Sequence, residues 1–396
     1  MKTLKDIDLK NKTVLIRADL NVPLDKSLNI TDDNRIREIL PTVQYALQAN
    51  ARVILCSHLG RPKGKVSAEF SLAPVARRLS ELLQKEVPLA PDCLGPEVQK
   101  MVQGMKPGDL LLLENLRFHP EEEKNDENFG RALAELADVY INDAFAVSHR
   151  SQASVVAVTL FAKACAAGFL LERELNFFNQ SMENPARPLV AVIGGAKVSS
   201  KLAVLENLME NVDKMIIGGA MANTFLKSQG IDTGKSLIEN DLVLTAASLM
   251  EKAKTKGVKF YLPVDCVAAA AFDVQSETRT ISLQEVPQEW MVLDIGPASS
   301  LLFSEALQDA KTVIWNGPMG AFEMEPFSQG TMTMVRNLAE SKALTVIGGG
   351  DTDMAVHKAG AASKMSYIST GGGAFLELLE GKKLPGVVAL EECSAR

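Results

Sequence analysis

The sequence predicts an α/β protein in which helices cover parallel β-sheets, and it predicts two domains. Short apolar runs alternate with segments of helical periodicity along nearly the whole chain, as in sheets whose parallel strands are joined by helical crossovers. The 396 residues exceed the usual size of a single domain. A break with two prolines at residues 184–188 interrupts the alternation and marks the expected domain boundary.

Several strands and helices are expected before this break. Apolar runs place the strands at residues 13–17, 52–56, 110–113 and 139–141. Apolar residues on one face place the helices at residues 36–48 and 73–83. The apolar segment 153–171 contains Lys163, which is costly inside a bilayer, so we expect a buried strand followed by a helix there. A helix at residues 171–178 then leads to the break.

The alternation resumes after the break. Strands are expected at residues 189–193, 215–217, 259–262, 291–293, 313–315, 344–347 and 367–368. The apolar stripe of Leu202, Leu205, Leu208 and Met209 predicts a helix after the first of these strands, and another helix is expected from residue 353. Ligands of open parallel sheets lie outside the carboxyl ends of the strands, so the residues that follow each strand are the candidate site residues.

The composition is that of a globular protein with a sizeable core, because 46% of the residues are hydrophobic and 23% are charged. The net charge of −7 argues against non-specific nucleic-acid binding. The charged start of the chain does not resemble a secretory signal. Five scattered cysteines without a CxxC pair are expected to be reduced thiols of a cytosolic protein.

Polar and cationic residues follow the strands of the first half. They are Asp19 and Asn21 after the first strand, His58, Leu59, Gly60 and Arg61 after the second, Arg117 after the third, Arg150 beyond the fourth, and Arg35 near a helix start. The guanidinium fork suits carboxylate and phosphate groups, so this set predicts an anion site. Structural ion pairing with acids such as Asp19, Asp33 and Glu114 is the alternative.

Glycine turns follow the strands of the second half, at residues 194–195, 218–219, 317–320, 348–350 and 371–373. A strand that turns through glycines into a helix presents backbone N–H groups to an anion. Asp351 fits a magnesium ligand for a nucleotide phosphate, and Thr352 fits a helix cap or a phosphate donor. A tight turn with a capping aspartate is the alternative.

Lys197 and Lys201 follow the first of these turns, and their spacing places them on one face of the expected helix. Lysines are unfavourable at the positive end of a helix dipole, and a bound polyphosphate would relieve this repulsion. Two solvated lysines are the alternative. The segment 230–236 resembles a Walker A loop but is one residue short, and no G-x-G-x-x-G motif is present, which weakens a dinucleotide-binding interpretation.

With these residues in view, the chain resembles the phosphoglycerate kinase family, of the bacterial type, over nearly its whole length. The matching motifs occur in order: RADLNVP at 17–23, SHLGRPKG at 57–64, ENLRFHPEEEKN at 114–125, NDAFAVSHRSQAS at 142–154, IGGAKVSSKL at 193–202, LPVDCVAA at 262–269, DIGPAS at 294–299, WNGPMGAFE at 315–323, IGGGDT at 347–352 and STGGGAFLELLEGKKLPGV at 369–387. Each motif alone is weak, whereas their order and spacing together are specific.

The resemblance implies Mg²⁺-dependent phosphoryl transfer between ATP and the carboxylate of 3-phosphoglycerate, which gives ADP and 1,3-bisphosphoglycerate. It implies two Rossmann-like three-layer domains with parallel sheets joined by a hinge helix. A 3-phosphoglycerate-binding domain would span residues 1–170, the hinge 171–186 and a nucleotide-binding domain 187–384. The tail 385–396 would pack back on the first domain. A cytoplasmic monomer that binds neither nucleic acid nor membrane is expected.

The resemblance also implies roles for individual residues. Asp19, Asn21, Arg35, His58, Leu59, Gly60, Arg61, Arg117 and Arg150 would bind 3-phosphoglycerate. Gly195, Ala196, Lys197, Lys201, Gly219, Asn316, Pro318, Glu323, Gly349, Gly350, Asp351 and Thr352 would bind the nucleotide, with Asp351 holding the metal. Arg35, Lys197, Gly371 and Gly372 would act on the transferred group. The chain departs from the family pattern at Tyr367, Phe375 and Asn223.

Two rival interpretations belong to other functional classes. An NAD-linked dehydrogenase would also use two Rossmann-like domains, but the missing dinucleotide motif argues against it. A nucleotide- or anion-binding module without catalysis is the second rival, and the presence of Arg35, Lys197 and Asp351 argues against it.

Overall fold

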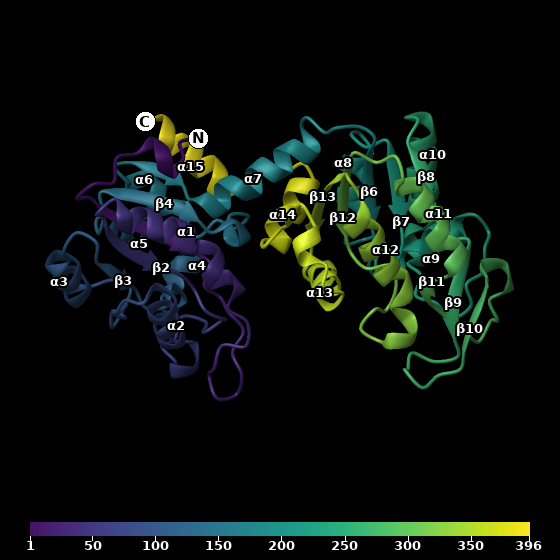
Figure 1. Ribbon diagram of the computed structural model, residues 1–396, viewed down its shortest axis with the longest axis horizontal. Helices are drawn as coiled ribbons and strands as arrows, with labels where there is room; N and C mark the ends of the chain where they lie inside the picture. The colour runs from purple at the N-terminus through teal and green to yellow at the C-terminus, as the bar shows by residue number, and fades with distance from the viewer. The chain divides into compact units, whose positions relative to one another are not determined.

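The computed structural model describes all 396 residues and divides into two compact units. Unit 1 comprises Met1–Leu175 together with Lys383–Arg396, and unit 2 comprises Asn176–Lys382. The division falls inside the helix α7 (Phe169–Met182), within the segment expected to connect the domains (Figure 1). No helix is both long and apolar enough to cross a membrane.

Unit 1 contains a five-stranded parallel sheet in the order β3-β2-β1-β4-β5. The strands are β1 (Thr13–Ala18), β2 (Arg52–Cys56), β3 (Leu110–Leu112), β4 (Val139–Asp143) and β5 (Cys165–Ala167). The helices are α1 (Asn34–Gln48), α2 (Ala73–Leu83), α3 (Pro96–Gly104), α4 (Pro120–Glu123), α5 (Glu127–Ala134), α6 (Ala157–Phe161) and α15 (Pro385–Ala395). Parallel strands covered on both faces read as continuous apolar runs, which is why these strands were recognisable in the sequence.

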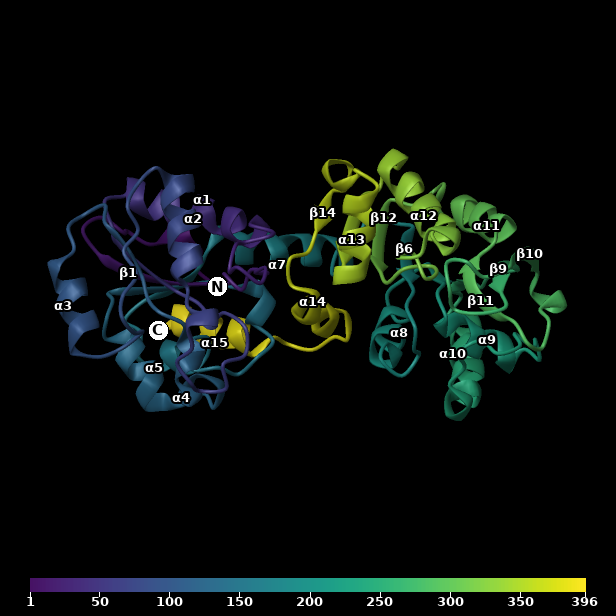
Figure 2. The same cartoon turned by 90° about the horizontal axis from the view of Figure 1, so that it is seen from below.

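Unit 2 contains a six-stranded parallel sheet in the order β14-β13-β12-β6-β7-β8 and a three-stranded antiparallel sheet in the order β10-β9-β11 (Figure 2). The strands are β6 (Leu189–Ile193), β7 (Lys214–Ile217), β8 (Lys259–Tyr261), β9 (Asp265–Ala269), β10 (Thr278–Ser282), β11 (Met291–Ile295), β12 (Thr312–Asn316), β13 (Leu344–Gly348) and β14 (Tyr367–Ile368). The helices are α8 (Leu202–Leu208), α9 (Met221–Ser228), α10 (Val243–Thr255), α11 (Pro297–Leu307), α12 (Gln329–Glu340), α13 (Gly350–Lys358) and α14 (Gly372–Leu379).

The predicted α/β class with parallel sheets is confirmed, and two predictions of single elements are wrong. The strand expected at residues 291–293 belongs to the antiparallel sheet, because it pairs with β9 rather than with the main sheet. The segment 153–171 contains the expected buried strand, β5, followed by the start of α7, and the short helix α6 precedes that strand without having been predicted. The helix expected from residue 353 already begins at Gly350.

The C-terminal helix α15 packs against β5 and α6 of unit 1, and both chain ends lie on this unit (Figure 1). This packing brings together Cys165 and Cys393, which form a disulfide although they are 228 residues apart. The expectation of five free thiols is therefore wrong for these two residues, because the pairing depends on the return of the chain end and leaves no local pattern in the sequence. Cys56, Cys93 and Cys266 are free and buried.

Reduction of this disulfide is expected to destabilise unit 1. A cross-link across such a long loop removes chain entropy from the unfolded state, and losing a native disulfide costs about 2–5 kcal/mol. The midpoint of urea unfolding should therefore fall to a lower urea concentration when a reductant is added to the oxidised protein. Cys393→Ser should have this lower midpoint with or without reductant. Cys266→Ser should keep the sensitivity to reductant. Identical curves for the oxidised and reduced wild-type protein would contradict this prediction.

Candidate functional site

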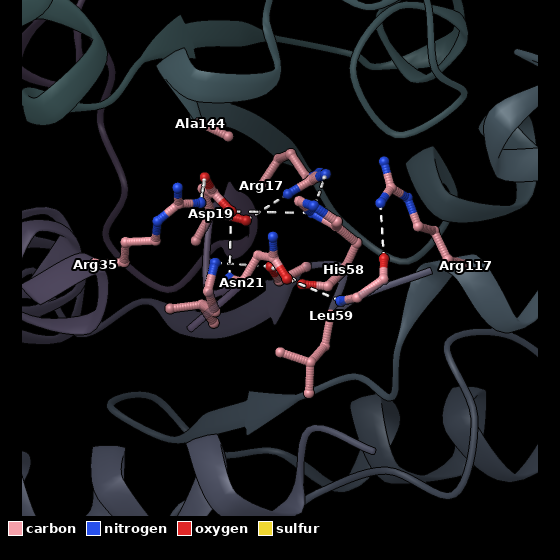
Figure 3. Close-up of polar contacts among 12 residues, drawn as sticks. Arg17, Asp19, Asn21, Arg35, His58, Leu59, Arg117 and Ala144 are labelled. Carbon is pink, nitrogen blue, oxygen red and sulfur yellow. Dashed lines mark hydrogen bonds and ion pairs between the residues drawn. The ribbon is translucent and has the colours of Figure 1, made fainter. Parts of the chain in front are cut away.

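The first candidate site lies in unit 1 where the strand order reverses. β2 and β3 lie on one side of β1 and β4 lies on the other, so the crevice beyond β1 and β4 is the expected ligand position. Asp19 accepts a hydrogen bond from Arg35 Nη1 (Figure 3). Asn21 Oδ1 accepts one from Gly60 N at 2.8 Å. The structure thus brings together four of the residues predicted to bind an anion.

Arg17 lies among the same residues, near the end of β1, where arginines at strand ends were expected to converge, although no binding role was predicted for it. Its side chain is fully buried. Its Nε donates to Ser154 Oγ at 2.8 Å, and its Nη2 lies 3.4 Å from His58 Nδ1 (Figure 3). Arg17 is the charged residue near the end of an otherwise apolar strand. Because a buried charge needs partners, this position could have indicated a group of polar side chains around it.

His58 is buried among these groups and adds no positive charge. Burial lowers the pKa of His58 well below its usual value, and the four arginines around it lower it further. Its Nδ1 lies 3.9 Å from Asp19 Oδ1. A neutral imidazole recognises a ligand by hydrogen bonding, so the positive charge of this site comes from the arginines alone.

The turn after β3 is fixed to the turn after β2. Arg117 Nη1 donates to Gly60 O at 2.8 Å. The fully buried Asn115 accepts from Leu59 N at 3.2 Å and from Arg117 N at 3.0 Å. Asn115 was not predicted as a site residue, and its hydrogen bonds position Leu59 and Arg117.

The alternative of structural ion pairing applies to some arginines of unit 1. Arg37 and Arg78 both pair with Asp33, at 2.8 and 2.7 Å. Arg35 pairs with Asp19, yet 39% of its side chain remains exposed. Arg35 can therefore contact a ligand while Asp19 orients it.

Arg61 and Arg150 also remain available for a ligand. Arg61 is exposed and makes no hydrogen bond or ion pair within the protein. Arg150 is half-buried, and its Nε donates to His149 Nε2 at 3.2 Å. No acid neutralises either guanidinium, which is the arrangement expected for binding an anion.

The second candidate site lies in unit 2, again where the strand order reverses, between β6 and β12. The glycine turns after these strands pack backbone against backbone. Gly194 N donates to Asn316 O at 3.0 Å, and Gly195 N donates to Pro318 O at 3.1 Å. A Cβ atom on Gly194 would lie 2.1 Å from Pro318 O, so glycine is required there for the two turns to meet.

These turns line a cavity of about 520 Å³. Of the predicted nucleotide-binding residues, its wall contains Gly195, Ala196, Gly219, Pro318, Glu323 and Asp351. Apolar side chains that were not predicted complete it, namely Leu226, Leu237, Phe272 and Met291. Leu237 and Phe272 are about half exposed, at 48% and 60%. A partly exposed apolar wall beside glycine turns suits a flat aromatic ring joined to an anionic group.

Two helix N-termini meet near this cavity. The Cβ position of Gly372, at the start of α14, lies 3.8 Å from Gly349 Cα at the start of α13. The first N–H groups of each helix have no partner inside the helix, and both helix dipoles present their positive ends here. The structure therefore places predicted anion-binding residues from two separate glycine runs side by side within unit 2.

Asp351 and Thr352 differ in their availability. Asp351 is exposed at the start of α13 and makes no hydrogen bond or ion pair within the protein, so its carboxylate can serve as a metal ligand. Thr352 is fully buried, and its Oγ1 accepts from Gly317 N at 2.7 Å. The hydroxyl of Thr352 thus joins the turns after β12 and β13.

The two lysines do not lie on a helix as predicted. The helix α8 begins at Leu202, and Lys197 and Lys201 lie in the turn before it, because the turn after β6 continues for several residues beyond its glycines. Lys201 Nζ donates to Asn316 Oδ1, and burial lowers the pKa of Lys201 to about 8 although Asp351 and Glu380 oppose the shift. Lys197 is exposed and makes no hydrogen bond or ion pair within the protein, although its charge contributes to lowering the pKa of Glu239.

The three departures from the family pattern occupy packing positions in unit 2. Tyr367 stacks on Phe177 of α7 with ring centroids 4.4 Å apart, and Phe375 packs edge-on against Phe178 at 6.3 Å. Asn223 is buried in the cavity wall, and its Nδ2 donates to Leu237 O at 3.4 Å. Two of the three departures therefore hold the second part of α7 against unit 2.

Comparisons with known proteins agree on one family. The family model described as "Phosphoglycerate kinase" matches residues 4–382. The phosphoglycerate kinase of Geotalea uraniireducens is 61% identical over 385 residues, with 97% of this chain and 96% of that protein covered. The phosphoglycerate kinase of Geobacter metallireducens is 62% identical over 384 residues, with the same coverage of each chain.

Solved structures give the same result. Phosphoglycerate kinase from Coxiella burnetii superposes with a TM-score of 0.93 at 44% identity, covering 99% of both chains. The enzyme from Pyrococcus horikoshii superposes with a TM-score of 0.85 at 32% identity, covering 100% of both chains. The chain therefore belongs to the phosphoglycerate kinase family, the glycolytic phosphotransferases that use a carboxyl group of 3-phosphoglycerate as acceptor and ATP as donor.

Proposed function

We propose that this chain carries out the family reaction by holding 3-phosphoglycerate at the arginine-rich site of unit 1 and Mg²⁺-bound ATP or ADP in the cavity of unit 2. The observation that carries this proposal is the pair of sites at the two strand-order reversals, one lined by arginines and the other by glycine turns. The first suits a small ligand with a phosphate and a carboxylate. The second suits a base, a sugar and a phosphate chain.

The substrate site would use both fixed and free groups of unit 1. Arg61, Arg117 and Arg150 supply positive charge for the phosphate of 3-phosphoglycerate. Asp19 and Asn21 would bind its hydroxyl and carboxylate region, and the neutral His58 would add a hydrogen bond. Gly60 holds Asn21 through its backbone N–H and Arg117 through its carbonyl oxygen, and the backbone N–H of Leu59 donates to Asn115.

Different parts of the nucleotide site would bind the base, the ribose and the phosphates. The apolar wall takes the base, Glu323 takes the ribose, and the turns at Gly195, Ala196, Gly219 and Pro318 shape the slot. Asn316, Gly349, Gly350 and Thr352 form or fix the turn that faces the phosphates, together with Lys197 and Lys201. Asp351 fits Mg²⁺, because a free carboxylate beside N–H groups suits a metal-bound phosphate better than a bare one. When bound, Mg²⁺ would offset negative charge on the phosphate oxygens.

Transfer between these ligands needs no general base, because the acceptor carboxylate is already ionised at neutral pH. The obstacle is repulsion between two anions. Arg35, Lys197 and the N–H groups of Gly371 and Gly372 would stabilise the charge on the transferred phosphoryl group. The two sites lie on separate units, so we propose that closure about α7 precedes direct in-line transfer and excludes water from ATP. We further propose a cytoplasmic monomer.

The shifted pKa of Lys201 predicts how nucleotide affinity depends on pH. The Lys201 ammonium is present below pH 8 and is lost as the pH rises through the value of about 8. ADP affinity should therefore fall above pH 8, by at most about tenfold per pH unit, with proton uptake on binding. Calorimetric titration with ADP in buffers of different ionisation enthalpy measures both the affinity and the number of protons taken up. Lys201→Arg should flatten the dependence, since arginine stays charged. Proton uptake that is unchanged in this variant would contradict the assignment.

A coupled assay of ATP consumption that depends on 3-phosphoglycerate tests the proposal directly. Wild-type protein should be active, whereas Lys197→Ala should lose turnover by at least roughly 100-fold, because an exposed lysine without a partner can act on the moving charge. Binding of 3-phosphoglycerate to Lys197→Ala should change little. A calorimetric titration in which Lys197→Ala loses 3-phosphoglycerate binding but keeps ADP binding would contradict the assignment of the ligands to the two units.

A further inference from the structure

Three potential metal ligands meet in unit 1 outside the residues assigned above. Asp92 and Cys93 are adjacent in the loop before α3, and His119 directly precedes α4. One ligand atom from each of these residues lies within 4.8 Å of the other two. His119 Nε2 lies 2.7 Å from Asp92 Oδ1. The proposed reaction uses none of these three side chains.

The surrounding structure fixes the positions of these ligands. Asp92 Oδ1 accepts from Cys93 N at 2.6 Å, and Glu114 N donates to Asp92 O at 3.4 Å. The imidazole ring of His119 packs on Phe129 with ring centroids 5.5 Å apart. The ligands therefore come from two chain segments that are held in place by backbone hydrogen bonds and ring packing, as a preorganised site requires.

The three side chains differ in how much of each is exposed to solvent, and this difference suits a bound cation. Cys93 is fully buried, whereas the side chains of Asp92 and His119 are 45% and 32% exposed. The group thus has one side inside the protein and one side open to solvent. Three protein ligands with an open position for water form a known type of zinc coordination.

The donor set selects the class of metal. One thiolate, one imidazole and one carboxylate suit a borderline ion such as Zn²⁺, whereas Mg²⁺ and Ca²⁺ prefer oxygen ligands. The charges also balance, because a thiolate and a carboxylate together neutralise a divalent cation. We propose that Asp92, Cys93 and His119 form a binding site for a divalent cation of the Zn²⁺ class.

Binding would replace the contact between His119 and Asp92. Bonds from the metal to its ligands are about 2.0–2.3 Å long, so His119 Nε2 and Asp92 Oδ1 must separate slightly to admit the ion. A bond forms between the metal and Cys93 Sγ, the S–H bond breaks, and the thiol proton goes to solvent. One proton is therefore released per cation bound.

Cobalt titration of the metal-free, full-length protein without nucleotide tests this proposal. One equivalent of Co²⁺ should produce a sulfur-to-cobalt charge-transfer band, with release of one proton, and Zn²⁺ should remove the band. Cys93→Ser should abolish it. His119→Gln should weaken Co²⁺ binding by more than the roughly 10–100-fold that losing an outer-shell partner costs. Cys266→Ser alters another buried thiol and should leave the band unchanged.

The absence of the band in wild-type protein would overturn the proposal, as would a band that persists in Cys93→Ser. Cys93 is buried, so the Cys93→Ser variant could fail to fold. His119→Gln therefore provides an independent test, because His119 is partly exposed. Unchanged Co²⁺ affinity in that variant would also overturn the proposal. None of these measurements depends on kinase activity, so they are separate from the test of the proposed function.

Discussion

Arg35→Ala should reduce turnover by on the order of 10³-fold, the range seen when an arginine that stabilises phosphoryl transfer is removed. Arg35 is the arginine of the unit 1 site that is paired with Asp19 and still partly exposed, so it is oriented and also able to reach a ligand. The substitution removes the positive charge that would stabilise the transferred phosphoryl group. ADP affinity should stay nearly unchanged, because the nucleotide cavity lies in unit 2.

Two further variants separate charge from geometry at this position. Arg35→Lys keeps the charge but loses the planar fork, and it should recover only part of the activity. Arg37→Ala is the matched control, because Arg37 lies on the same helix but is 51% exposed and pairs with Asp33. It should retain nearly full turnover. Steady-state kinetics and ADP calorimetry measure these effects, and substantial turnover in Arg35→Ala would remove Arg35 from the transfer step.

Gly194→Ala should disrupt the nucleotide site and destabilise unit 2. The added Cβ would lie 2.1 Å from Pro318 O and 2.6 Å from Gly317 O, both backbone atoms that cannot move aside cheaply. The turns after β6 and β12 would separate and carry Gly195 and Pro318 out of position in the cavity wall. We expect a loss of about 3 kcal/mol in the free energy of unfolding. ADP affinity should fall by at least roughly tenfold, or about 1.4 kcal/mol.

Gly104→Ala is the control for this substitution. A Cβ on Gly104 would have no atom within 4 Å, and the residue lies in the helix α3 of unit 1. This variant should unfold at or slightly above the wild-type urea midpoint, because alanine favours the helical conformation. Urea unfolding and ADP calorimetry decide the outcome. Wild-type stability together with wild-type ADP affinity in Gly194→Ala would show that the two turns can separate without cost.

The sequence predicted the parallel strands well because these strands are buried on both faces and read as continuous apolar runs. β2 and β6 have the predicted bounds, as does α2. It failed for the sheet membership of β11, whose first three residues, Met291–Leu293, look like any other short apolar strand. Strand direction and sheet membership depend on which strand lies alongside, and a local pattern does not contain that partner.

The candidate site residues divide in the same way. Residues that follow parallel strands could be listed from the sequence, because the carboxyl ends of such strands meet at one edge. Arg17 and Asn115 could not be assigned, since their contribution is a set of contacts with neighbouring strands and turns. The role of Thr352 as a bridge between two turns was likewise visible only after folding.

The sequence by itself determined the α/β class, the family, and the identity of the charged and glycine residues at the strand ends. These properties follow from local apolar periodicity and from motif order, both of which are written along the chain. The tertiary structure alone decided which arginines are neutralised, which hydroxyls are occupied, and which cysteines meet. Cys165 and Cys393 are joined because α15 returns to unit 1, and contacts between distant segments are created only when the chain folds.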